Sequence, residues 1–409
     1  MVVEATLKLR YRWAMLILYA ISPILVHGTE LGRPDHQSLL ILIATIAICA
    51  EWNLRAEDSA VAAKDRSKWS VVSGVASGLA IWTSAYESLV LFLLVILVSA
   101  LGSAKALSAR FRRAGWVSFV LVIAIAFSIE QRVPSLSIFY SDPLFQNWAR
   151  TIGELEYVSP ANPIWLRWCG YLLFVTPLLV WISVTKAMRS GERTTPAFVL
   201  VLLAATYVLT IWQARWGYFF VLIFALVLAS LLGSINASTA VWTAFLLSML
   251  PVLRDWDERL WVNDTQFTNR VEKRNESVQL RDLALSLRSS QTRPFLAPWW
   301  LSPPIAYWSG QPGVAGSSHE SLNGIADSAR FFLSDDLEKI RQILANHQTA
   351  WVIAYDSERV AQNSAALLNG PVPTHPRCRV LDRTRSGAPP FLVLSAQNPV
   401  AKLYRVVAR

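Results

Sequence analysis

The sequence is poor in charge and in cysteine. Asp, Glu, Lys and Arg make up 16% of its 409 residues, against about 25% in soluble globular domains. Its three cysteines, Cys49, Cys169 and Cys378, are too few and too scattered for a disulfide framework or a paired-cysteine zinc site. It also has no Gly-rich phosphate loop and no Ser-His-Asp order, so no motif points to nucleotide binding or serine hydrolysis.

What the chain has instead is apolar sequence, with 54% hydrophobic residues and 18 Trp. The apolar residues fall in blocks as far as about residue 254, and the remainder reads as ordinary globular sequence. This pattern predicts a polytopic α-helical membrane protein with a C-terminal α/β domain. The predicted domains are a transmembrane helical part, residues 1–254, and a soluble extracytoplasmic part, residues 255–409.

A membrane-spanning helix needs roughly 20 mostly apolar residues, and we expect about nine of them. The segments are Trp13–Val26, Ser38–Ala50, Ser70–Tyr86, Ser88–Ala104, Ala114–Ile129, Pro163–Val184, Ala197–Trp212, Gly217–Ile235 and Ser238–Leu253. The third is rich in Gly and Ser, which indicates close helix packing. The third and fourth meet at Glu87. No small-residue cleavage site follows the first segment, so we expect no cleavable signal peptide.

The basic residues indicate the orientation. With nine spans, most of those near the helix ends fall on one side: Lys8, Arg10 and Arg12; Arg55, Lys64, Arg66 and Lys68; Lys105, Arg110, Arg112 and Arg113; Lys186, Arg189 and Arg193. This side should be cytoplasmic, in a multi-pass protein of the cytoplasmic (inner) membrane. The C-terminal domain then lies outside. Because the net charge of +10 is explained by these short loops, we expect no nucleic-acid partner.

The opposite side collects polar residues from distant parts of the chain. The first outer loop, residues 27–37, reads HGTELGRPDHQ and holds Asp35 and His36. A later loop holds Thr-Ile-Gly-Glu, residues 151–154, and Arg215 precedes another span. A carboxylate beside membrane helices is costly unless it pairs with a cation or lines a wet cavity. Glu154 is therefore a candidate functional residue, although it also fits a solvated loop glutamate.

These side chains suit one kind of chemistry. Carboxylate oxygens with an imidazole favour Mg²⁺ or Mn²⁺, and the planar guanidinium of Arg215 suits phosphate. A cation and an arginine beside a membrane indicate a lipid-linked phosphate or diphosphate substrate. Structural alternatives stay open, since Asp35 directly precedes a helix and fits an N-cap, and Arg215 fits a residue that reaches the lipid headgroups.

Together these motifs resemble the catalytic subunit of oligosaccharyltransferases, membrane glycosyltransferases of the GT-C superfamily. The resemblance rests on Gly-Arg-Pro-Asp-His-Gln after a span, on Thr-Ile-Gly-Glu, on Arg215 and on the segment from Trp299-Trp300 to His319. It implies that Asp35, His36 and Glu154 bind the metal, with Asp35 and Glu154 catalytic, and that Arg215 contacts the lipid-linked diphosphate. It also implies acceptor contacts at Trp299, Trp300 and His319, although packing as an aromatic belt is an alternative for the tryptophans.

The chain departs from this family at two places. The family has a first acidic motif and about four more N-terminal spans, so we expect a chain shortened at its start or one completed by a partner subunit. The Trp-Trp-Asp-Tyr-Gly motif is replaced by Trp-Trp-Leu-Ser-Pro, residues 299–303, so the acceptor can be a protein or another glycan.

The sequence therefore predicts transfer of a glycan from a polyprenyl-(di)phosphate donor to an acceptor on the outer face of the bilayer. A related enzyme that uses a polyprenyl monophosphate sugar is an alternative, and a non-catalytic accessory protein is another. A transporter is disfavoured, because no internal repeat is visible. In the tail, Phe295–Ala297, Ala350–Tyr355 and Pro390–Leu394 read as strands. Leu280–Leu287 and Asp335–Asn346 read as helices, the second with a near-capping pattern at Asp335.

Overall fold

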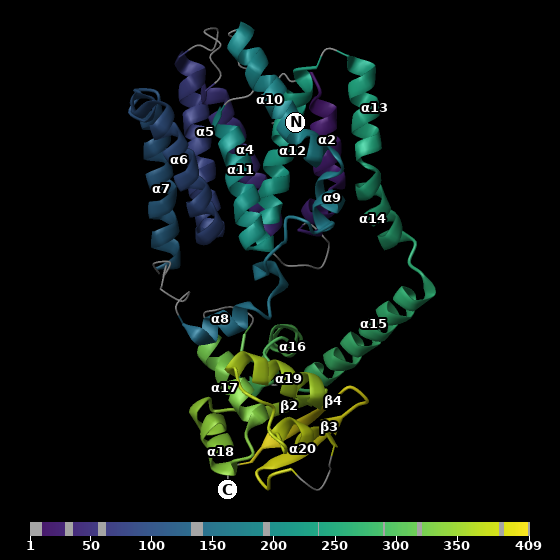
Figure 1. The fold of residues 1–409 in the computed structure, drawn as a ribbon. Coiled ribbons are helices and arrows are strands. Elements are labelled where there is room, and N and C mark those ends of the chain that lie inside the picture. Colours follow the sequence, from purple (N-terminus) through teal and green to yellow (C-terminus); the bar gives the residue numbers. More distant parts are fainter. Residues whose placement is uncertain are drawn as a thin grey trace. The chain divides into compact units, whose positions relative to one another are not determined.

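The computed structural model describes residues 10–28, 36–55, 63–131, 142–190, 197–235, 237–288, 291–316, 321–383 and 388–407. The chain divides into two compact units (Figure 1). The helical unit comprises Met1–Leu136 and Glu154–Trp261, and the C-terminal unit comprises Ser137–Gly153 and Val262–Arg409. Each unit is described by itself below.

The described elements of the helical unit are all helices. They are α2 (Arg12–Ile21), α3 (Pro23–His27), α4 (Gln37–Arg55), α5 (Ala63–Thr83), α6 (Ala85–Leu107), α7 (Arg112–Glu130), η2 (Gly153–Leu155, which begins at the unit boundary), α9 (Ile164–Cys169), α10 (Leu172–Ser190), α11 (Ala197–Trp212), η3 (Ala214–Trp216), α12 (Gly217–Gly233), α13 (Ser238–Ser248) and α14 (Leu250–Leu260).

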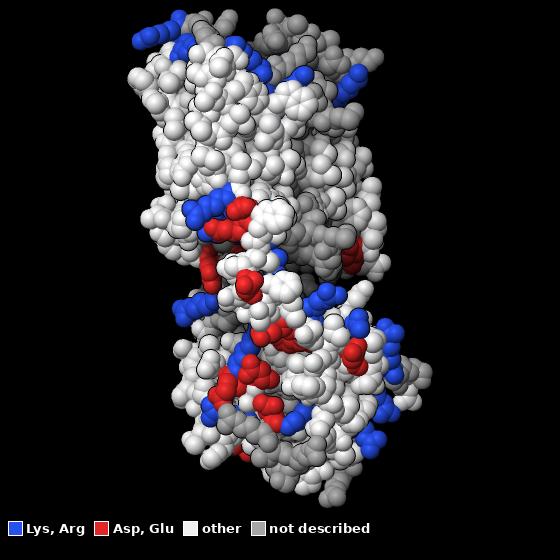
Figure 2. Space-filling model, turned by 90° about the vertical axis from the view of Figure 1, so that its right-hand side faces the viewer, with Lys and Arg blue, Asp and Glu red and all other residues white. Residues whose placement is uncertain are grey.

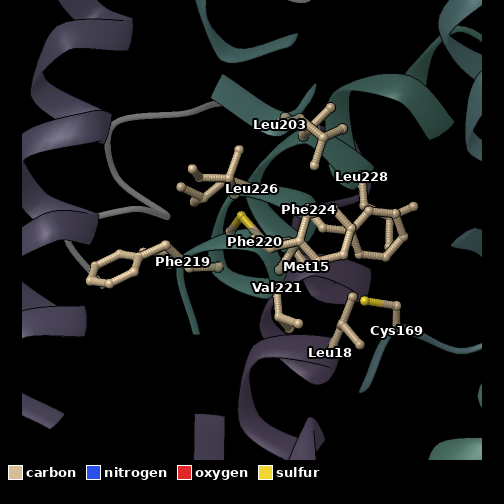
Figure 3. Close-up of a cluster of buried hydrophobic side chains, with 14 of the residues drawn as sticks. Met15, Leu18, Cys169, Leu203, Phe219, Phe220, Val221, Phe224, Leu226 and Leu228 are labelled. Atoms are coloured by element: carbon tan, nitrogen blue, oxygen red, sulfur yellow. The ribbon is translucent and has the colours of Figure 1, made fainter. Parts of the chain in front are cut away.

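Helix α12 is the centre of this unit. Every residue from Gly217 to Leu232 is buried, as expected for a helix that is apolar on all sides. It packs against α2, α4, α10 and α11. Figure 3 shows side chains of α12, such as Phe220 and Phe224, among Met15 of α2, Cys169 of α9 and Leu203 of α11.

Small residues bring α5 and α7 close together, as the Gly and Ser content of α5 predicts. A Cβ added at Gly74 would lie 2.1 Å from the carbonyl oxygen of Gly115, and one added at Gly115 would lie 2.4 Å from the carbonyl oxygen of Ser70. Both distances are far below van der Waals contact. The two backbones therefore touch, and either glycine is replaceable only if the helices move apart.

Three helices of the described chain are long and apolar enough to cross a membrane: Gln37–Arg55, Arg112–Glu130 and Ala214–Gly233. Shorter apolar helices include Arg12–Ile21, Ala85–Ala100, Leu172–Lys186 and Ala197–Trp212. The expected total of nine spans stays a prediction.

Two of the expected spans are interrupted. The first breaks at Ser22, because Pro23 disfavours the helical conformation in the residue before it. The sixth breaks at Gly170, whose φ of +72° ends α9 before α10 begins.

The outer faces of the helical unit are apolar. Exposed side chains there include Val120 on α7, Phe174 on α10 and Val208 on α11. Figure 2 shows an uncharged belt on the face in view, with both acidic and basic side chains at its lower end and Lys and Arg at its upper end. That end holds the C-terminus of α4, the N-terminus of α7 and the C-terminus of α10 (Figure 1). The apolar faces favour contact with lipid, while the cytoplasmic placement of the basic end stays a prediction.

The C-terminal unit combines helices with a small mixed sheet. Its elements are α8 (Pro143–Ala149), α15 (Asp264–Leu285), β1 (Phe295–Leu296), α16 (Ser302–Ser309), α17 (Leu322–Leu333), α18 (Leu337–Asn346), β2 (Trp351–Tyr355), α19 (Ser357–Leu368), α20 (Arg377–Arg383), β3 (Leu392–Gln397) and β4 (Ala401–Val406). The strand order is β1-β2-β4-β3. The β1–β2 pair is parallel, and β4 is antiparallel to both β2 and β3.

Local details of this unit differ from the expectations. The side chain of Asp336, and not that of Asp335, caps α18, since its Oδ1 accepts hydrogen bonds from the backbone N–H groups of Glu338 and Lys339. Strand β4 was not expected. Helix α8 packs through Phe145 and Trp148 onto α17 and α19, so part of the loop after α7 belongs to this unit. This division does not test the predicted domains, residues 1–254 and 255–409, and they stay a prediction.

Candidate functional site

Arg215 is held in place by a buried carboxylate. It lies in η3, between α11 and α12, and its Nη2 is 2.9 Å from Oε1 of Glu87. Glu87, in the first turn of α6, is 1% exposed and also accepts a hydrogen bond from the Ser84 hydroxyl. The ring centroid of Tyr86 is 5.8 Å from the Arg215 guanidinium carbon. The Tyr86 hydroxyl donates to the side chain of Gln213 over 3.4 Å.

The pairing of Glu87 with Arg215 is the contact that sequence reasoning missed. The sequence did carry a signal for it, because Glu87 lies between two apolar runs. A carboxylate there is costly without a cation partner. The Nε–H of Arg215 is buried and has no hydrogen-bond partner in the part of the chain that the structure describes. A buried donor without a partner is rare and costly. Arg215 therefore keeps one donor available after it has paired with Glu87.

The loop that follows Glu154 lies beside Arg215. The backbone N–H of Ala214 donates to the carbonyl oxygen of Glu156 over 2.9 Å, and the N–H of Val158 donates to that of Ile211 over 3.0 Å. Glu154 itself is half-buried in η2. These bonds hold the chain just after Glu154 against the residue that precedes Arg215. Two predicted site residues, far apart in sequence, thus belong to neighbouring segments.

The expected metal residues are only partly described. His36 is exposed in the turn before α4, whereas Asp35 lies outside the described residues. On the other side of that gap, a Cβ at Gly28 would lie 3.1 Å from the ring of Tyr218, in the first turn of α12. The N-termini of α4, α6 and α12 lie at the same end of the helical unit (Figure 1). His36, Glu87 and Arg215 thus share this end.

The described residues do not by themselves form a metal site. Among them, no three His, Cys, Asp or Glu side chains are grouped so that they could hold an ion. The Mg²⁺ or Mn²⁺ site predicted at Asp35, His36 and Glu154 therefore depends on Asp35, and it stays a prediction.

The expected acceptor residues lie in the C-terminal unit. Trp299 and Trp300 are half-buried in the turn before α16, and their rings meet edge to face with centroids 5.7 Å apart. Trp299 packs against the core that includes Phe145, and Trp300 packs against the core of the sheet. These contacts lie within the C-terminal unit, so they test neither the aromatic-belt alternative nor acceptor binding, and both stay predictions. His319 lies outside the described residues.

Comparisons with known proteins show a likeness of fold. No family model matches the chain, and no curated protein matches it. Among solved structures, it is similar to the oligosaccharyltransferase of Archaeoglobus fulgidus tethered to an acceptor peptide with an NVT sequon, with a TM-score of 0.54 and 12% identity. It is also similar to the apo form, with a TM-score of 0.54 and 13% identity.

A third similar structure is the A. fulgidus oligosaccharyltransferase AglB in complex with an inhibitory peptide and a dolichol-phosphate, with a TM-score of 0.57 and 12% identity. The three matches each cover 87% of this chain but only 56–58% of the other. The chain therefore has an oligosaccharyltransferase-like fold and spans somewhat more than half the length of these proteins. At this identity the likeness concerns the fold alone.

Proposed function

We propose that this chain is a membrane glycosyltransferase that transfers a glycan from a polyprenyl-(di)phosphate donor to a protein or glycan acceptor. The proposal is supported by the oligosaccharyltransferase-like fold and by the complex of one such protein with a peptide and a dolichol-phosphate. The observation that carries it is the buried, unpartnered Nε–H of Arg215 beside the loop of Glu154. Arg215 and Glu154 both belong to the helical unit, where a lipid-linked substrate would reach them.

Arg215 is suited to the leaving group of this reaction. As the bond between the sugar and the phosphate oxygen breaks, negative charge develops on the phosphate. A guanidinium stabilises such charge strongly where water is excluded. Glu87 orients the guanidinium through Nη2, which leaves Nε–H for the phosphate. In this proposal Glu154 also contacts the substrate, and the divalent cation is a separate prediction because it depends on Asp35.

One observation favours a second candidate, a non-catalytic accessory protein. Arg215 already has a carboxylate partner at 2.9 Å, and Glu87 is buried. A pair of this kind is sufficient to lock α6 to η3 without any substrate. The two candidates differ in whether Arg215 affects chemistry or only stability.

The test is release of glycan from a polyprenyl diphosphate that carries one N-acetylglucosamine, with the full chain in lipid vesicles and an acceptor peptide present. Loss of one preorganised donor to developing charge typically lowers the rate about 10²–10³-fold, so Arg215→Gln should show a loss of this order. The matched control is Arg254→Gln, because the Arg254 side chain is 81% exposed on α14. Absence of release by the wild type would support the accessory protein, whereas equal release by wild type and Arg215→Gln would remove Arg215 from the mechanism.

A further inference from the structure

A second polar site lies inside the helical unit, at its basic end. A cavity of about 80 Å³ is lined by residues of α4, α5, α6 and α7. One water needs only about 10–15 Å³ of such volume, so a compact polyatomic group also fits. The lining is mostly apolar, with a charged group at one place, where Glu51 and Arg112 face the cavity.

Among the described side chains, the charges of this group do not balance. Arg112 makes two hydrogen bonds to the carboxylate of Glu51, at 2.6 and 3.0 Å. Arg55 reaches the same carboxylate over 3.5 Å and donates to the Ser99 hydroxyl on the cavity wall. The Ser73 hydroxyl also donates to Glu51, over 2.7 Å. Two guanidinium groups thus share one carboxylate, the only one among the lining residues.

A buried excess of positive charge is costly unless an anion compensates it. Arg112 is 8% exposed, and its Nε–H has no hydrogen-bond partner among the described residues. The hydroxyl of Ser88, a lining residue 4% exposed, also lacks one. Arg55, Arg112 and Glu51 together therefore carry a net positive charge at the cavity. The cavity lining also carries a buried N–H donor, that of Arg112 Nε, without a hydrogen-bond partner among the described residues. These properties match a singly charged anion such as a phosphodiester.

The cavity borders the lipid-facing side of the helices. On that side its lining includes Phe92, Trp116 and Phe119, all half-exposed. The rings of Phe92 and Phe119 stack with centroids 4.7 Å apart and an interplanar angle of 9°. The seam between α6 and α7 is thus lined by aromatic side chains. A ligand that enters through this seam comes from the hydrocarbon region of the bilayer, and its apolar part remains along the seam.

We infer that this cavity binds the phosphodiester headgroup of an anionic membrane lipid. The Nε–H of Arg112 donates to the phosphate, Arg55 completes the charge balance, and the acyl chains lie along the seam of α6 and α7. The inference does not depend on glycosyl transfer. It requires only that the helical unit lies in a bilayer.

The test measures lipid binding to the purified full chain by native mass spectrometry in detergent. The probes are phosphatidylglycerol, phosphatidylcholine with the same acyl chains, and inorganic phosphate. Phosphatidylglycerol should bind at least about tenfold more tightly than phosphatidylcholine, which is about 1.4 kcal/mol. Equal binding of the two lipids would overturn the inference. Displacement of phosphatidylglycerol by millimolar inorganic phosphate would show a site for small free anions and would overturn the lipid assignment.

Matched variants assign the site to the cavity. Arg112→Lys keeps a cation beside Glu51 but removes Nε–H, and it should weaken phosphatidylglycerol binding about tenfold. Its control is Arg113→Lys, at the next, exposed position of α7, which should bind as wild type. If Arg112→Lys elutes as aggregate, Ser77→Leu fills the cavity wall without any change of charge. It should also abolish binding, whereas Ser128→Leu, on the exposed face of α7, should not. Wild-type binding by a folded Arg112→Lys or Ser77→Leu would refute the assignment.

Discussion

The pair Glu87–Arg215 gives an unequal prediction for its two partners. Arg215→Gln removes the cation from a carboxylate that is 1% exposed. Leaving a buried charge without its partner costs about 3–5 kcal/mol. Glu87→Gln instead leaves an arginine whose side chain is 21% exposed and can reach water. Its cost should be smaller, about 1.5–3 kcal/mol, the range for loss of a polar interaction with a charged group.

The double variant separates this reasoning from a general loss of packing. Once Glu87 is neutral, replacement of Arg215 no longer strands a charge. Glu87→Gln/Arg215→Gln should therefore be more stable than Arg215→Gln alone, with a coupling free energy of about 2 kcal/mol or more. The assay is unfolding of the purified chain in mixed micelles, followed by tryptophan fluorescence. Additive effects, or a larger cost for Glu87→Gln than for Arg215→Gln, would refute the reasoning.

Three further predictions follow from other parts of the chain. Gly115→Ala places a Cβ 2.4 Å from the Ser70 carbonyl oxygen and should destabilise the chain by about 1–3 kcal/mol in the same assay. Gly233→Ala, which meets nothing within 4 Å, should be neutral or stabilising by up to about 1 kcal/mol, and equal losses would contradict the close packing. Burial, followed by the hydrogen bond to Glu276, raises the pKa of Tyr355 to about 12 from about 10 in model peptides. The resulting stabilisation is complete below pH 10 and is lost as the pH rises toward 12. Tyr355→Phe should thus flatten the fall of unfolding free energy across that interval, and parallel curves would contradict this. Finally, a chelator should abolish glycan release and added Mg²⁺ or Mn²⁺ should restore it. Undiminished release in the chelator would show that the reaction needs no divalent cation.

Long apolar helices were the part of the fold that the sequence predicted best. Helix α12 (Gly217–Gly233) is apolar on every side, so burial and helical structure both follow from its composition. The small residues of α5 likewise predicted close packing, although not that its partner would be α7. The breaks at Ser22 and Gly170 were missed, because the apolar composition continues through both. Strand β4 is stabilised by pairing with two other strands, and its own six residues carry only a weak pattern.

The candidate site was predictable in its location and not in its contacts. Basic residues were counted as loop charges from their spacing, yet Arg55 and Arg112 turn inward onto Glu51. Glu87 and Arg215 are 128 positions apart, and nothing in a single sequence couples them. Such pairs are set by how helices pack, which depends on the whole bundle.

The most direct test of the central claim compares two glutamates of one loop. Glu154 is half-buried at the start of the loop that lies beside Arg215, whereas the side chain of Glu156 is exposed and its backbone carbonyl oxygen accepts the hydrogen bond from Ala214. The measurement is release of glycan from the polyprenyl diphosphate donor in vesicles by Glu154→Gln and Glu156→Gln. If these helix ends and loops form a site for a lipid-linked donor, Glu154→Gln loses about 10²-fold or more of the rate and Glu156→Gln retains it. Wild-type release by Glu154→Gln would contradict the account.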